Sequence, residues 1–321
     1  MLPRMLLALA VAVAAAPAAL AQAYPAKPVR VIVTFPPGGT PDIYGRVMAA
    51  ELQRIWSQSV VVENRTGAGG TIGSDYVAKA PPDGYTLLFA ADATITIAPH
   101  LYSKLPYDPV RDFAPIVNVT AGPFVLMANP AFAPNNVKEL IALVQSQPGK
   151  VSYASSGAGG QQHLAMEYIR TMAGSMDMIH VPYKGFGQGI ADVLANQVPL
   201  IFGGITASIQ LTKSGKLKAL AVTGPKRAKA LPNVPAVAET LPGFDITAWY
   251  GFLAPAGTPR EIVKKIHDDS VAVIKRPDFL ERLDRDGIEP VGNTPEEFAA
   301  QIKTDLAHWA KIVKAAGAKL D

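Results

Sequence analysis

The sequence contains no cysteine, and this absence excludes several kinds of site. Disulfide frameworks, thiol nucleophiles and thiolate metal sites all depend on cysteine. The five histidines show no spacing of the HxxxH type, so no metal ligand is predicted. A strong excess of one charge is also missing, because 30 basic residues face 26 acidic ones and leave a net charge of +4. The densest basic run, Lys226, Arg227 and Lys229, contains no aromatic residue, so no nucleic acid partner is expected.

An apolar run long enough to span a membrane is missing as well. Residues 1–23 carry one basic residue, Arg4, then an apolar run at residues 6–16 and small residues that end in Ala21-Gln22-Ala23. This pattern is typical of a secretory signal cleaved near Ala23. No later stretch approaches about 18 uninterrupted apolar residues. The sequence therefore predicts an exported, soluble protein.

The hydrophobic fraction of 49%, with 17% charged residues, indicates a folded core. Short β-branched runs alternate with segments of helical spacing, which predicts an α/β protein with parallel sheets and helices on both faces. The predicted strands are 29–34, 60–63, 85–90, 124–127, 151–153, 178–181, 200–202 and 219–223. The predicted helices are 41–56, 73–80, 137–147, 161–173, 187–196, 205–213, 260–275, 277–286 and 295–316.

The last three helices follow one another with little strand between them, so we expect this tail to return to the first α/β unit. We predict two lobes, one formed by residues 24–123 plus 245–321 and the other by residues 124–244. Each lobe then has an ordinary domain size. Two such lobes create a cleft where the carboxyl ends of their strands face one another, and open α/β sheets bind ligands there.

The first glycine-rich loop, residues 35–42, joins a predicted strand to a helix. Gly38 and Gly39 expose backbone N–H groups at a helix start, which attracts anions. Thr40 is predicted to cap the helix, with Asp42 in its first turn, paired with Arg46 four residues later. A tight strand-to-helix turn explains the two glycines equally well.

The second loop, residues 64–73, has glycines at the spacing GxGxxxG, and Asp92 follows the next strand where a ribose-binding acid would lie. This pattern imitates a dinucleotide fingerprint. The fingerprint belongs to the first strand of such a fold, however, and here it follows the second. We therefore expect no nucleotide cofactor.

Two further loops, residues 155–163 and 181–187, follow strands of the second predicted lobe. An exported α/β hydrolase is an alternative interpretation, with Ser155 or Ser156 as nucleophile and His163 as base. Neither serine lies in a GxSxG elbow, so that signature is missing. In the other loop, Lys184 either holds a carboxylate or is an ordinary surface charge.

Several motifs together resemble the Bug family of periplasmic solute receptors, which are similar to TctC proteins and serve tripartite tricarboxylate transporters. The resemblance runs in the family's order through the whole mature chain. Its motifs include Phe35-Pro-Pro-Gly-Gly39, Pro81-Pro-Asp-Gly-Tyr85, Leu105-Pro-Tyr-Asp-Pro109, His180-Val-Pro-Tyr-Lys-Gly185 and Thr294-Pro-Glu-Glu-Phe298. It implies a periplasmic, non-enzymatic protein with a two-lobed Venus flytrap fold, two mixed or parallel sheets flanked by helices. It also implies a small organic acid as ligand and the transporter's membrane subunits as partners. We expect a monomer. A sensory receptor that signals through another protein remains an alternative.

The resemblance also implies which residues bind the ligand. Those at the family's loop positions are Phe35, Gly38, Gly39, Thr40, Asp42, Asn64, Thr66, Asp92, Ala93, Thr94, Ser155, Ser156 and Gly157. To these we add residues at which this chain departs from the family's pattern or carries a polar group nearby, namely Gly160, Lys184, Phe186, Gly203 and Gly204.

The departures predict a roomier and less polar cleft than is usual in the family. Pro41 stands where a hydroxyl residue is common, Gly160 lacks another hydroxyl, and Gly203 and Gly204 replace two polar residues. Phe186 occupies a position that is more often small. We therefore expect a ligand that is larger than a C4 dicarboxylate, or aromatic, with Phe186 as a stacking face. The alternative is that Phe186 packs on its own lobe or points into solvent.

Overall fold

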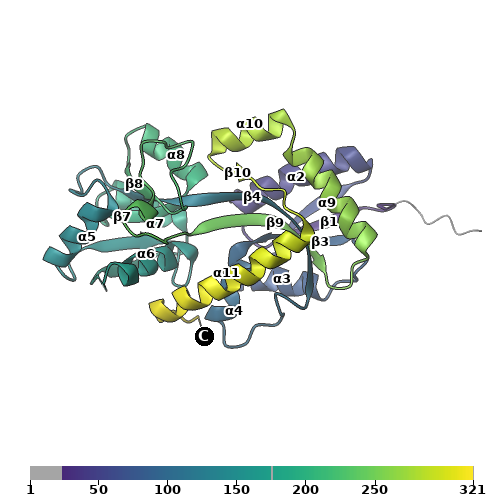
Figure 1. Cartoon of the computed structure of the whole chain (residues 1–321), viewed down its shortest axis with the longest axis horizontal. Coiled ribbons are helices and arrows are strands. Elements are labelled where there is room, and N and C mark those ends of the chain that lie inside the picture. The colour runs from purple at the N-terminus through teal and green to yellow at the C-terminus, as the bar shows by residue number, and fades with distance from the viewer. Residues whose placement is uncertain (1–23, 175, 321) are drawn as a thin grey trace, which may run out of the picture.

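The computed structural model describes residues 24–174 and 176–320. The predicted signal segment, residues 1–23, lies outside the described residues. Figure 1 shows an elongated molecule with two bodies of strands and helices along its long axis. The alternation of strands and helices expected from the sequence is confirmed.

The strands and helices have the following bounds in chain order. The first part contains β1 (Val29–Val33), α2 (Thr40–Trp56), β2 (Val60–Asn64), η1 (Ala68–Gly70), α3 (Thr71–Ala78), β3 (Thr86–Ala91), η2 (Ala93–Ile97), α4 (Ala98–Leu101) and β4 (Phe113–Ala128). The middle contains α5 (Val137–Ser146), β5 (Ser152–Ser155), α6 (Gln161–Met172), β6 (Ile179–Pro182), α7 (Phe186–Leu194), β7 (Leu200–Gly204), α8 (Ile205–Lys213), β8 (Lys218–Val222) and η3 (Val237–Glu239). The last part contains β9 (Thr247–Pro255), α9 (Arg260–Ile274), α10 (Pro277–Asp286), β10 (Glu289–Pro290) and α11 (Pro295–Ala316).

Hydrogen bonds connect the strands in the order β2-β1-β3-β9-β4-β7-β5-β6, with β8 and β10 also pairing with β4. The β1 strand is parallel to β2 and β3, and β5 is parallel to β6 and β7. The connecting strands β9 and β4 are antiparallel to their neighbours. The sheet is therefore mixed, with one parallel group in each body, as the fold class predicted.

The longest strand, β4, joins the two bodies. Its first part, residues 113–123, pairs with β9, whereas residues 124–128 pair with β7. The sequence predicted a strand over 124–127 only, so that assignment was too short, and β9 was not predicted at all. The pairing partner changes between Pro123 and Phe124, next to the predicted lobe boundary. The boundaries themselves stay a prediction.

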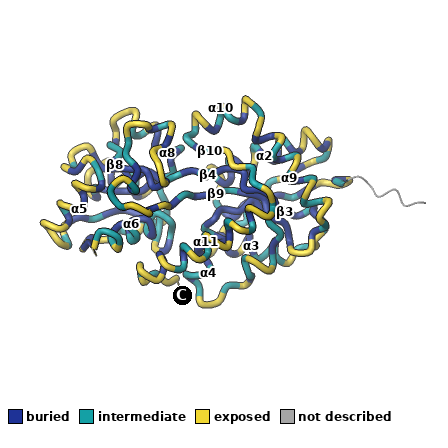
Figure 2. Tube along the Cα trace, in the orientation of Figure 1, coloured by how far each residue is buried: buried dark blue, intermediate teal, exposed yellow. Residues whose placement is uncertain are grey.

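Helix α11 lies across both bodies (Figure 1). Its first half packs Phe298 with Leu88 of β3, whereas its second half packs Trp309 and Ile312 in a core with Leu164 of α6. The buried residues follow the strands through the middle of both bodies, and exposed residues lie on the outer helices and loops (Figure 2). In the described part of the chain, we find no helix long and apolar enough to cross a membrane.

Candidate functional site

A cavity of about 950 Å³ lies between the two bodies. The first and third glycine-rich loops line it from opposite sides, through Gly38 and Gly39 on one and Ser156 and Gly157 on the other. Apolar side chains cover much of the remaining wall. The lining apolar side chains of the larger kind are Phe35, Ile43, Ile97, Leu101, Tyr102, Phe124, Phe186, Tyr250 and Leu320. Within residues 24–174 and 176–320, no Lys, Arg, His, Asp or Glu side chain lines the cavity.

Four helices begin at this cavity. The N-cap residues of α2, α6, α7 and α8 are Gly39, Gly160, Gly185 and Gly204, and none of them supplies a side-chain cap. The first N–H groups of a helix have no partner inside it, and each helix start carries about half a positive charge. The cavity therefore offers backbone donors and positive potential without any cationic side chain.

The first loop is held in shape from behind by Asp42. This carboxylate is buried, and it accepts hydrogen bonds from the Gly38 N–H at 3.0 Å, Arg46 Nε at 2.9 Å and Asn64 Nδ2 at 2.8 Å. Burial by itself would raise the pKa of Asp42, but the hydrogen bonds from Arg46, Gly38 and Asn64 outweigh it and lower that pKa. Gly38 has φ +87°, which glycine adopts without strain.

The predicted pairing of Asp42 with Arg46 is thus confirmed. The predicted cap was wrong by one residue, because Gly39 is the N-cap and Thr40 is already helical. With a glycine there and Pro41 next, no side-chain oxygen competes for the first amides, and the Asp42 carboxylate turns back to the loop instead. Thr40 itself lines the cavity, whereas Asp42 and Asn64 lie behind its wall.

The segment after β3 is divided in the same way. Ala93 lines the cavity, but Asp92 and Thr94 are fully buried behind it. Thr94 Oγ1 donates to the Ala91 carbonyl at 3.0 Å, which anchors the turn. Asp92 Oδ2 accepts a hydrogen bond from Gln161 Nε2 at 2.6 Å. Burial raises the pKa of Asp92 well above its usual range.

In the third loop, Ser156 lines the cavity and donates through Oγ to Gln162 Oε1 at 2.8 Å. Ser155 is fully buried behind it, with its Oγ 2.7 Å from His180 Nε2. Burial, with a contribution from His163, lowers the pKa of His180 to about 4, so this ring is neutral near neutral pH.

The nucleophile–base pair of the hydrolase interpretation is not formed as predicted. His163 Nδ1 accepts from the Gly159 N–H at 3.1 Å, and its ring stacks on that of His180 with 4.1 Å between centroids. Ser155 meets His180 instead, in a position away from the cavity wall. His163 lies in the first turn of α6, and its ring helps to fix the loop backbone by accepting the hydrogen bond from Gly159.

The remaining predicted residues divide between the wall and its surroundings. Thr66 and Lys184 are exposed and do not line the cavity, while Gly204 lines it. Gly203 is buried, and a Cβ there would lie 2.9 Å from the Phe186 ring. Phe186 therefore packs on its own lobe over Gly203 and lines the cavity at the same time. Which of these residues touch a ligand stays a prediction.

Apart from Ala93, sequence reasoning missed the cavity wall formed by η2, α4, β9 and the C-terminal segment. Ile97, Leu101, Tyr250 and Leu320 belong to it. None of these residues stands in a motif, and only the packing of distant segments brings them together. A further signal was the pair of glutamines after Gly160, since Gln161 and Gln162 both line the cavity.

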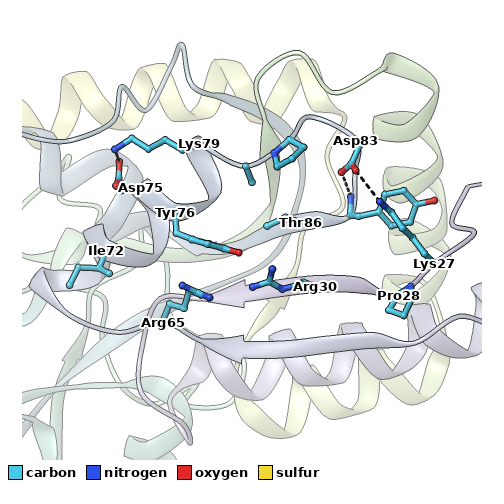
Figure 3. A pocket seen from close by; sticks show the side chains of 13 residues that line it. Lys27, Pro28, Arg30, Arg65, Ile72, Asp75, Tyr76, Lys79, Asp83 and Thr86 are labelled. Atoms are coloured by element: carbon cyan, nitrogen blue, oxygen red, sulfur yellow. Dashed lines mark hydrogen bonds and ion pairs between the residues drawn. The ribbon is translucent and has the colours of Figure 1, made fainter.

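A second hollow, of about 730 Å³, lies beside β1, β3 and α3 (Figure 3). It is rich in charge, but its charges are paired with each other. Lys79 Nζ lies 2.6 Å from Asp75 Oδ1, and Lys27 Nζ lies 3.3 Å from Asp83 Oδ2. Arg65 lies over a tyrosine ring at 3.7 Å. Among the described residues, no group of three or more His, Asp or Glu side chains could hold a metal ion.

Comparison with protein-family models finds one match. A model described as "Tripartite tricarboxylate transporter family receptor" matches residues 44–318. Among curated proteins, the chain is 36% identical over 303 residues to the protein BugT of Bordetella pertussis, covering 94% of this chain and 92% of the relative.

Solved structures with the same fold are also found. A protein described as a periplasmic transporter is 42% identical, with a TM-score of 0.83, covering 93% of this chain and 100% of the other. A Rhodopseudomonas palustris protein solved with adipate is 33% identical, with a TM-score of 0.84 and coverages of 92% and 100%. MatC from the same organism, solved with bound malate, is 30% identical, with a TM-score of 0.79 and coverages of 90% and 100%.

Proposed function

Since this chain belongs to the family of tripartite tricarboxylate transporter receptors, we propose that it captures a small organic carboxylate between its two lobes and delivers it to the membrane subunits of such a transporter. The single observation that supports this most is the meeting of four helix starts at one neutral cavity. Backbone amides at helix starts bind anions without a cationic side chain. The structures solved with adipate and malate show that similar proteins take such ligands.

Capture requires contacts from both lobes, and these exist together only when the lobes are closed. A ligand that binds both walls shifts the population toward that state. The movement that we propose is a hinge at the crossing strands, near Pro123 of β4 and Asp245 before β9. Small-angle scattering with and without a tightly bound ligand tests it. The expected result is a smaller radius of gyration with ligand, and an unchanged radius contradicts the hinge.

A thermal-shift screen with matched neutral compounds tests the function itself. The protein, freed of bound ligand by unfolding and refolding, is mixed with mono-, di- and tricarboxylates and with their amides. We expect a carboxylate to raise the melting temperature and its amide, for example adipamide beside adipate, to have little effect. If no carboxylate stabilises the protein, or the amide stabilises it equally, the proposal is wrong.

The proposed ligand is aromatic or larger than a C4 dicarboxylate. The cavity volume of about 950 Å³ is at the upper end of small-molecule sites, and its walls are largely apolar. The Phe186 ring on its surface offers a stacking face.

Replacing Phe186 by alanine tests this ligand class. We expect Phe186→Ala to weaken the binding of an aromatic acid such as benzoate about tenfold, because the stacking contact is lost. The binding of malate should change by less than about twofold. Titration calorimetry with both ligands measures the difference. Strong binding of aspartate or malate with none of any aromatic acid would contradict the ligand class but not the receptor function.

Export to the periplasm is part of the proposal. It rests on the signal-like residues 1–23 together with the family membership. Expression of the full chain in a bacterial host, followed by N-terminal sequencing of the periplasmic fraction, should yield a mature chain that begins near Tyr24. Retention of the uncleaved chain in the cytoplasm would contradict this part.

A further inference from the structure

A buried carboxylate lies directly behind one wall of the interlobe cavity. Asp92 is 0% exposed, and its Oδ2 accepts a hydrogen bond from Gln161 Nε2 at 2.6 Å. Its Oδ1 has no hydrogen-bond partner among the described residues. An unsatisfied buried polar group costs about 1–3 kcal/mol, and more when it is charged. A carboxyl group whose only function was structural would be expected to have both oxygens satisfied.

The hydrogen-bond partner of this carboxyl is the side-chain amide of Gln161. It is the first residue of α6, next to β5, so it reaches Asp92 from the other body of the molecule. It also lines the cavity, and no partner for its Oε1 is found in the part of the chain that the structure describes. A glutamine amide has an acceptor at one end and two donors at the other. If Asp92 bonds to one end of the Gln161 amide, the other end faces the cavity. The choice made by Asp92 therefore decides whether the cavity contains an acceptor or a donor at this point.

We propose that Asp92 is a positioning residue that sets the polarity of the Gln161 amide according to whether it carries a proton. When the carboxyl is ionised, Nε2 donates to it and the acceptor Oε1 faces the cavity. When it is protonated, its O–H donates to Oε1 and Nε2 faces the cavity as a donor. This inference rests on the proposed binding of a carboxylate, which needs donors and so favours the second arrangement. If Asp92 is ionised in the free protein, ligand binding then transfers a proton from water to it.

The surroundings of Asp92 favour the protonated form. Its pKa is raised first by burial and further by the negative charge of Asp305 on α11, and these outweigh the backbone N–H groups of Ala93 and Asp92 and the Gln161 amide, which lower it. Tyr250 of β9 also faces Asp92, and burial raises its pKa too, so it is neutral. On the adjacent helix α4, burial lowers the pKa of His100, which keeps that ring uncharged near neutral pH. None of these groups supplies a positive charge that would hold Asp92 ionised.

Titration calorimetry in two buffers of different ionisation enthalpy tests the proposal, with adipate, malate and benzoate as probes from about pH 5 to about pH 9. Where the pH lies above the pKa of Asp92, we expect proton uptake on binding to the native protein. Above the pKa of Asp92, affinity should fall by up to about tenfold per pH unit. Asp92→Asn keeps the shape and the hydrogen bond but cannot titrate, so its binding should show no proton uptake and little dependence on pH.

A matched pair of glutamine variants guards against a general effect of the mutation. Gln161→Met breaks the connection to Asp92, so binding should weaken and lose its pH dependence. Gln162→Leu removes the neighbouring amide, whose partner Ser156 does not titrate, so binding should weaken but keep the native pH dependence. Unchanged proton uptake in Asp92→Asn or Gln161→Met overturns the inference. Binding of a probe to the native protein without proton uptake at any pH of the series overturns it as well, while the receptor function stands. Failure of every probe to bind refutes both.

Discussion

The two hollows of this molecule differ in how they use charge. The hollow beside β1 and α3 contains four basic side chains, yet Lys27, Arg30 and Lys79 each pair with an acid, and Arg65 stacks on a tyrosine. The interlobe cavity has no charged lining side chain among the described residues, but four helix starts open into it. Charge that is already neutralised attracts little. Backbone donors at helix starts that line a largely apolar space attract an anion more effectively.

The strongest way to break this contrast is to put a charge into the neutral cavity. A Cβ at Gly204 meets no atom within 4 Å, and its φ of −59° suits any residue, so Gly204→Asp should fold. Its carboxylate would cap α8 and repel the ligand. We expect carboxylate affinity to fall about a hundredfold or more, since facing like charges cost several kcal/mol. Calorimetric titration measures it, with Gly204→Ala as the matched control. Equal effects of both substitutions would show that crowding, not charge, is responsible.

Glu63 near the charged hollow and Asp92 near the neutral cavity should make stability depend on pH in opposite directions. Hydrogen bonding to Arg30 lowers the pKa of Glu63, whereas burial raises that of Asp92. Glu63 therefore adds stability above the unfolded pKa of about 4.3, and this is lost as the pH falls through its folded pKa. Asp92 contributes fully to the stability of the folded state below its unfolded pKa of about 3.9. This contribution is lost as the pH rises through its raised folded-state pKa.

Melting temperatures of the two amide variants across a pH series measure this difference. The melting temperature of Asp92→Asn should rise relative to that of the native protein as the pH rises. At about pH 8 the difference should be about 2–4 °C for each 1 kcal/mol of stability that the native protein loses by ionising Asp92. Glu63→Gln should lose a smaller amount at neutral pH, because Glu63 is partly exposed, and match the native protein in acid. Parallel curves for both variants would contradict the assigned directions.

The smallest expected effect is in the charged hollow. Removing the guanidinium in Arg65→Ala should leave carboxylate affinity within about twofold and cost about 1 kcal/mol of stability or less, because a cation–π contact with Tyr76 and an ion pair with Glu63 are lost. Affinity by calorimetry and a denaturant titration measure the two effects. A loss of tenfold or more in affinity would mean that the charged hollow takes part in ligand capture after all.

Most helices and strands could be predicted from the sequence, because each type of element spaces its apolar residues in a characteristic period. Helix starts at Arg260, Pro277 and Pro295 were predicted as found. The first half of β4 was missed because Pro115, Gly122 and Pro123 are usual strand breakers. The pairing with β9 shifts register next to Pro115 and again next to Asn118, whereas Gly122 and Pro123 pair with it in regular register. Such irregular pairing depends on the neighbouring strand and has no one-dimensional signal.

The site was predictable where backbone chemistry dictates residue type. Glycines at positions 38, 39, 157 and 160 marked both loops that face each other across the cavity. Direction within a loop was not predictable: Ser155 and Ser156 are adjacent, yet one is buried against His180 and the other faces the cavity. Nor could the bond between Asp92 and Gln161 be foreseen, because 69 positions separate them in the sequence and only the packing of the two bodies brings them together.

The packing around Gly203 restricts which residues this position can hold. A Cβ there would come within 3 Å of Met127 on β4, Ser208 on α8 and Phe186 on α7, at 2.7, 2.7 and 2.9 Å. A larger residue at this position would therefore require side chains on three separate elements to move. Because residue 203 carries no side chain, the Phe186 ring can lie against β7 and still line the cavity, so the shape of this wall depends on a glycine that does not itself line it.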